Sequence, residues 1–174
     1  STLTNRVEFH PNGMKRSESV KDNYGKIESS TSWNEEGKIE KKISDKGKLT
    51  TYYSPEDSEN PTHVLKVLPG YDNHYITRYF FNGTKKPKKE IHEYNEYTSD
   101  YHKETSFDQE TGHPTYSFTK KDNVLHLETS FENGIPKTTV AYNPLDPSGR
   151  PKETRSHDEN GDVHKIVQHG YNGE

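Results

Sequence analysis

The segment VLHLETSFENG, residues 124–134, contains the two signals that decide the fold of this chain. Its side chains alternate between two sets, with Leu125, Leu127, Thr129 and Phe131 in one and His126, Glu128 and Ser130 in the other. A period of two residues places such sets on opposite faces of a β-strand. The segment ends in Asn133-Gly134, which favours a two-residue type I′ turn because both central residues need a positive φ. The segment therefore predicts a strand and a tight hairpin turn.

The same pattern recurs along the chain. Similar units are KIESSTSWNEEG (26–37), YHKETSFDQETG (101–112) and RPKETRSHDENG (150–161). Asn-Gly also occurs at 12–13, 82–83 and 160–161, where we expect the same type I′ turn. Turn signals about 8–12 residues apart are typical of consecutive hairpins. We predict an all-β antiparallel meander of about 11–13 short strands, forming either an extended twisted sheet or an incompletely closed barrel.

One region departs from this rhythm. Ile91, Tyr94, Thr98 and Tyr101 are at helical spacing, which gives a short helix near 89–102 as an alternative to strands. No linker divides the chain, so residues 1–174 are predicted to form a single β-hairpin-repeat domain. The closing GYNGE (170–174) begins another aromatic-Asn-Gly unit, so a segment of a longer repeat array is the alternative.

The composition limits both the core and the function. Hydrophobic residues make up 25% of the 174 residues and aromatic residues 11%, so the chain can fold but has little with which to build a large core. We expect the aromatic side chains to supply most of that core. The absence of cysteine excludes disulfides and thiolate metal sites. The net charge of −4 argues against a nucleic-acid partner, and no apolar stretch is long enough for membrane insertion.

Two families share short motifs with this chain. FHPNGMKRSES (9–19) and FFNGTKKPKKEIHEY (80–94) resemble the aromatic-x-Asn-Gly repeats of the MORN-variant family, which includes YwqK-type antitoxin proteins. YNPLDPSGRPKETRSHDENG (142–161) resembles the YD-type repeats of large bacterial surface and toxin proteins. The resemblance concerns architecture. It implies a β-repeat protein that binds another protein or belongs to a toxin or surface assembly, and it carries over no catalytic residues.

Histidine offers the one candidate metal site. If Asn160-Gly161 forms a two-residue turn, His157 lies opposite His164, with their Cβ atoms about 4.5–5.5 Å apart. The two imidazoles could then share a weakly bound divalent metal, with His169 or a carboxylate as a third ligand. The alternative is that these histidines are exposed polar residues. We expect no other cofactor.

The chain contains no recognised catalytic motif, and its 28 acidic residues do not single out a pair for glycoside hydrolysis. The sequence therefore neither indicates nor excludes an enzymatic activity, and a protein without one is the expectation. Aromatic residues that the core does not use are the candidate binding residues, because tyrosine is enriched in interface cores. The candidates are Trp33, Tyr52, Tyr75, Tyr79, Tyr116 and Tyr142.

These observations predict a non-enzymatic binding protein. Its partner would be another protein, at a bacterial surface or as a secreted toxin that the chain neutralises, and its exposed strands or sheet edges would form the interface. We expect it outside the cell or at the cell surface, with a cytoplasmic location as the alternative. A carbohydrate-binding or carbohydrate-cleaving β-protein and a structural spacer of a larger repeat protein are the alternative functions.

Overall fold

The computed structural model of the protein describes residues 2–70 and 73–170. It consists of 14 antiparallel strands that follow one another in chain order, from β1 to β14, in an open meander that does not close into a barrel. The all-β prediction is confirmed. The strands outnumber the 11–13 expected from the turn signals. In the described part of the chain, no helix has the length and apolar character needed to cross a membrane.

The chain divides into two compact units, 1–71 with 75–86 and 72–74 with 87–174. The first unit contains β1 (Thr4–Phe9), β2 (Lys15–Lys21), β3 (Ile27–Trp33), β4 (Ile39–Ser44), β5 (Leu49–Tyr52), β6 (His63–Val67) and β7 (Tyr75–Phe80). A single 3-10 turn, η1 (Asp45–Gly47), joins β4 to β5. The expectation of a single domain stays a prediction.

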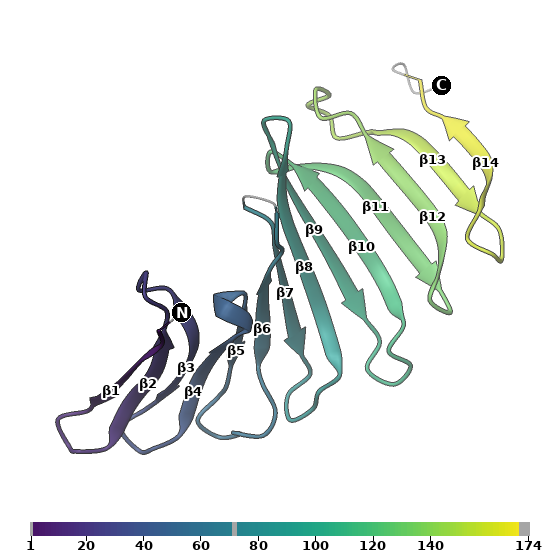
Figure 1. The fold of residues 1–174 in the computed structure, drawn as a ribbon. Helices are drawn as coiled ribbons and strands as arrows, with labels where there is room; N and C mark the ends of the chain where they lie inside the picture. Colours follow the sequence, from purple (N-terminus) through teal and green to yellow (C-terminus); the bar gives the residue numbers. More distant parts are fainter. Residues whose placement is uncertain (1, 71–72, 171–174) are drawn as a thin grey trace. The chain divides into compact units, whose positions relative to one another are not determined.

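The second unit contains β8 (Pro87–Glu96), β9 (Ser99–Phe107), β10 (Pro114–Lys121), β11 (Val124–Glu132), β12 (Ile135–Tyr142), β13 (Pro151–His157) and β14 (Val163–Gln168). In each unit the strands lie side by side and the turns alternate between the two ends of the strands (Figure 1). The unit begun by GYNGE lies, apart from Gly170, outside the described residues.

The alternative of a short helix near 89–102 is wrong, because this segment forms most of the β8–β9 hairpin. Tyr94 and Tyr101 are paired across the two strands, with their rings stacked at 4.9 Å and 4°. The tip of the hairpin contains Tyr97 and Thr98, both at positive φ. The spacing that resembled a helix therefore belongs to residues that face one another across a hairpin.

Most of the Asn-Gly turns also differ from the prediction. Asn133 and Gly134 both have a positive φ, as a type I′ turn requires. At 12–13, 82–83 and 160–161 only the glycine does, and the loop is longer. At 158–162 the amide of Asp158 donates to the Asp162 carbonyl, and the amide of Gly161 donates to the Asp158 carbonyl. These loops contain a turn that ends in a left-handed glycine.

A β-bulge follows the turn in eight of the hairpins. The register between the paired strands shifts by one residue, and the extra residue always lies on the strand after the turn. The extra residues are Arg16, Glu28, Glu40, Thr115, His126, Lys137, Lys152 and His164. A bulge bends the strand and redirects a side chain, so these polar residues depart from strict alternation.

Each unit is a single layer of sheet. Strands contact the strands beside them, and among the described elements only η1 packs against other parts of the first unit, namely β3, β4 and β5. No apolar side chain of a described residue is buried; the buried residues are Ser117 and Thr119, at 6% and 8% exposure. The prediction that aromatic residues form a core is therefore wrong. They lie half-exposed on the faces of the sheet, where cross-strand contacts replace a core.

Candidate functional site

A row of paired residues crosses one face of the first unit from β1 to β7. Its members share that face because each is the register partner of the next. The row is Glu8, Ser17, Ser32, Lys41, Tyr52, His63 and Tyr79. The small polar side chains of Ser17 and Ser32 lie toward the β1 end of the row, and aromatic side chains occupy the end nearest β7.

The aromatic end of this row is a stack of three rings, which we call the aromatic ladder (Tyr52, His63 and Tyr79). The rings of Tyr52 and His63 are 4.4 Å apart with an interplanar angle of 11°, and those of His63 and Tyr79 are 5.2 Å apart at 22°. Burial between the two tyrosines lowers the pKa of His63, because it disfavours the charged imidazolium. The stack fixes both phenol rings on an open face of the sheet.

The serine end of the row is hollow, and we call this hollow the serine trough. It has a volume of about 760 Å³. Its lining includes Glu8, Arg16, Ser17, Ser32, Trp33, Glu40, Lys41 and Tyr52. The hollow includes the serines of β2 and β3, whose side chains are much shorter than those around them.

Two of the predicted binding residues meet in the second unit. The Tyr116 hydroxyl donates to Glu128 Oε2 at 2.5 Å, and the Tyr142 hydroxyl donates to Glu128 Oε1 at 2.6 Å. Burial and the carboxylate raise the pKa of Tyr116 to about 12, and the bond to Glu128 and burial raise that of Tyr142 to about 12. Both phenols therefore stay protonated, and one carboxylate of β11 orders two aromatic side chains on the strands that flank it, β10 and β12.

The remaining two candidates have different surroundings. Trp33, at the end of β3, lines the serine trough, and its carbonyl accepts a hydrogen bond from Nε2 of His10 at 2.8 Å. Tyr75 is the register partner of Val67 and lies outside the row that forms the aromatic ladder. The structure thus brings Tyr52 close to Tyr79, Tyr116 close to Tyr142, and Trp33 close to the trough, but it does not gather the six candidates in one place.

The expected pairing of His157 with His164 is wrong. His157 is the register partner of Val163, because the longer turn at 158–162 and the following bulge displace His164. Nδ1 of His157 donates to the Gly161 carbonyl at 3.0 Å, so in the neutral ring Nε2 accepts from the Thr139 hydroxyl at 2.9 Å. Both nitrogens already have protein partners.

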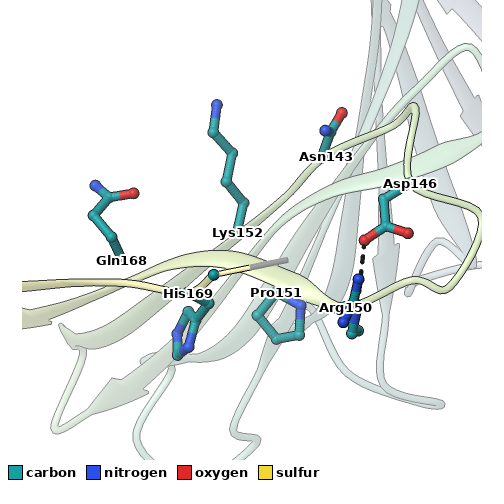
Figure 2. Close-up of a pocket in the computed structure, with 8 residues that line it drawn as sticks. Asn143, Asp146, Arg150, Pro151, Lys152, Gln168 and His169 are labelled. Carbon is teal, nitrogen blue, oxygen red and sulfur yellow. Dashed lines mark ion pairs between the residues drawn. The ribbon is translucent and has the colours of Figure 1, made fainter. Parts of the chain in front are cut away.

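His169 lies apart from this hairpin loop, in a hollow of about 240 Å³ beside the β12–β13 loop. Its Nε2 is 2.9 Å from the Thr154 hydroxyl. Figure 2 shows its ring pointing away from Lys152, while Arg150 forms an ion pair with Asp146 at 3.7 Å. Among the described residues, no group of three or more histidine, cysteine, aspartate or glutamate side chains could hold a metal ion.

Sequence reasoning missed the polar residues that organise the aromatic ones. His63 was not recognised between the two tyrosines, because its neighbours are 11 and 16 residues away along the chain. His74 and His92 were also missed; their rings stack at 4.6 Å and their Nε2 atoms are in contact. For Glu128 a signal existed, since the alternation in 124–131 places it on the face opposite Leu127.

Comparisons with known proteins leave the family open. No family model matches the chain, and no curated protein matches it. A mutant of S. aureus TarM, crystallised in complex with Fondaparinux, alpha-GlcNAc-glycerol and UDP, is 23% identical over 53% of this chain and 17% of its own, with a TM-score of 0.38. A second TarM structure is 21% identical over 58% of this chain and 18% of its own, with the same TM-score.

A protein of unknown function from Bacteroides fragilis matches over more of the chain. It is 9% identical over 96% of this chain and 91% of its own, with a TM-score of 0.23. This chain spans less than a fifth of the length of the TarM structures it matches.

Proposed function

We propose that this chain is a non-enzymatic protein that binds another protein through the exposed surface of its sheet. The observation that supports this most is the exposure of large apolar side chains in the terminal strands. Val7 and Phe9 in β1 are 38% and 61% exposed, and Ile166 and Val167 in β14 are 54% and 40% exposed. Val7 and Phe9 are two residues apart and so share one face of β1, and apolar side chains grouped on an exposed face are typical of protein interaction sites.

The tyrosines of both units supply candidate anchors. Stacking on His63 holds Tyr52 and Tyr79, and hydrogen bonds to Glu128 hold Tyr116 and Tyr142. An aromatic ring that is ordered before the partner arrives loses little conformational entropy on binding. Ordered tyrosines at the centre of an interface often contribute most of its binding energy.

The acidic groups with perturbed pKa values have structural explanations, which supports a function without covalent chemistry. The pKa of Asp57 is lowered by hydrogen bonds from Asn60, that of Asp108 by Thr111, and that of Asp146 by Ser148. All three carboxylates lie in loops and accept hydrogen bonds from residues that follow them closely in the chain. Their charges stabilise turns.

The partner is proposed to be a bacterial surface protein, a host protein or a secreted toxin that the chain neutralises. This part of the proposal rests on the motif resemblance to MORN-variant and YD-type repeats. The proposal includes a location outside the cell or at the cell surface, which the same resemblance supports.

The experiment is a capture comparison with matched tyrosine variants. The immobilised full chain, Tyr79→Ser and Tyr116→Ser are each incubated with extracts of the source cells and with extracellular proteins, and retained proteins are quantified by mass spectrometry at several loadings. We expect one protein to saturate the wild-type chain. The retained amount of that protein should be at least tenfold lower with one of the two variants.

Tyr24→Ser is the control, because Tyr24 is 89% exposed in the β2–β3 turn and lies on neither face. Retention should be unchanged in this variant. The proposal is overturned if no protein saturates the chain, or if the control variant loses the same protein to the same extent.

A further inference from the structure

The floor and the end wall of the serine trough have different chemistry. Ser17 and Ser32 are register partners and present hydroxyl groups at its base. Tyr52 forms one end. One face of its ring is covered by His63 of β6, so the other face is directed toward β4 and the trough. The result is a polar floor beside an aromatic surface whose position is fixed from behind.

The charged groups of the trough have both signs. Glu8 is paired with Arg6 at 3.0 Å and accepts a hydrogen bond from the Ser17 hydroxyl at 3.4 Å. Arg16, Glu40 and Lys41 line it, and within the described part of the chain none of their side chains takes part in a hydrogen bond or ion pair. Arg16 and Glu40 are the extra residues of two bulges. Because of the bulges, Arg16 lines the same hollow as the adjacent Ser17, and Glu40 lines the same hollow as the adjacent Lys41. The trough therefore offers separate donors and acceptors to a ligand.

We propose that the serine trough binds a neutral oligosaccharide, with a sugar ring stacked on the free face of Tyr52. Sugar hydroxyls both donate and accept hydrogen bonds, so one ligand satisfies the carboxylate of Glu40 and the cations of Arg16 and Lys41. The mixture of charges disfavours a polyanion, which would meet Glu8 and Glu40. The volume of about 760 Å³ lies in the range of small-ligand sites. This site shares Tyr52 with the proposed protein-binding surface, but its charged groups, Arg16, Glu40 and Lys41, are not part of that surface.

The test uses the full chain against an array of immobilised neutral oligosaccharides, followed by calorimetry with the best binder. Lys41→Met and Lys42→Met form a matched pair, because adjacent residues of β4 point to opposite faces. We expect Lys41→Met and Arg16→Met each to weaken binding at least tenfold, and Lys42→Met to stay within twofold of the wild type. Circular dichroism checks that all variants fold.

Three results would overturn the proposal. The first is that no oligosaccharide on the array is retained. The second is that Lys41→Met and Arg16→Met bind the retained sugar as well as Lys42→Met does. The third is that the trough variants abolish capture of a protein partner while sugar binding is unchanged, which would assign the trough to the protein interface instead. Loss of sugar binding with protein capture intact keeps the two proposals distinct.

Discussion

Single polar residues hold the aromatic side chains of this protein in place, because the described part of the sheet has no buried apolar side chain. Glu128 holds two tyrosines on different strands, and His63 holds two more by stacking. In a protein with a core, neighbouring apolar side chains would fix these rings. Here a carboxylate and an imidazole do so, and their removal should be visible in the tyrosines themselves.

Replacement of Glu128 by Gln should lower the pKa of both tyrosines. The carboxylate contributes to raising both pKa values to about 12, so in Glu128→Gln both tyrosines should titrate closer to the ordinary tyrosine pKa of 10.0. Ultraviolet absorbance during alkaline titration measures this directly. The free energy of unfolding should fall by about 1 kcal/mol, because both hydroxyls lose a charged acceptor but remain accessible to water. An unchanged titration curve would show that Glu128 does not hold these phenols in solution.

Acidification should destabilise the protein. Burial lowers the pKa of His63, His92 and His126 below the ordinary histidine value of 6.5. Between these lowered pKa values and pH 6.5, the unfolded chain therefore binds more protons than the folded one. The contribution of these histidines to the free energy of unfolding is fully present above pH 6.5. It is lost as the pH falls through their folded-state pKa values. Urea unfolding at pH 7.5 and pH 5 measures the difference. His63→Phe keeps the stack and should reduce the pH dependence, and an equal dependence in that variant would contradict this assignment.

At the scale of the element, the recurrent unit is a hairpin with a capped loop and a bulge. Asp22, Asn34 and Asp158 occupy equivalent loop positions, and each accepts hydrogen bonds from the amides two and four residues later. The glycine three residues later has a positive φ in all three loops. The side-chain acceptor and the glycine together fix the loop, so the register of the next strand depends on both.

Asn34 tests this dependence. Asn34→Ala removes the acceptor for the amides of Glu36 and Lys38, and the free energy of unfolding should fall by about 1 kcal/mol. Asn34→Asp should be close to neutral, because aspartate fills the same position in two other loops. Equilibrium denaturation of both variants gives the comparison, and equal destabilisation by Ala and Asp would refute the capping role.

Sequence reasoning succeeded where a single strand or turn carries the signal. Turn signals about 8–12 residues apart identified the hairpins, because the glycines at these turns, such as Gly13, Gly37 and Gly161, have a positive φ. It failed where two strands must be aligned. The bulges shift the register after the turn, so His164 could not be placed opposite His157 from spacing alone. Tyr94 and Tyr101 suggested a helix because their spacing along the chain does not show that they face each other across two paired strands.

At the scale of the whole molecule, each strand depends on its sheet neighbours. Among the described strands, the extensive contacts are those between adjacent pairs, as in repeat proteins whose stability is a sum over neighbours. The expected consequence is a gradient of stability along the second unit. β10 contains the two buried residues and has paired strands on both sides, whereas every residue of β14 is exposed.

Hydrogen exchange should report this gradient. Amides in Pro114–Lys121 should exchange most slowly within the second unit, and those in Val163–Gln168 should exchange fastest among its strands. Mass spectrometry of peptic fragments from the native protein gives the order. Uniform protection across β8 to β14 would instead indicate that the unit opens in one cooperative step.

The absence of buried apolar side chains among the described residues also determines how the protein responds to temperature. The heat capacity increment of unfolding comes mainly from apolar surface that becomes hydrated, and polar surface offsets it. A sheet that already exposes its apolar groups has little more to hydrate when it unfolds. Its heat capacity increment should therefore be small for its length and its stability curve broad, so that cooling weakens the fold far less than in a domain with an apolar core.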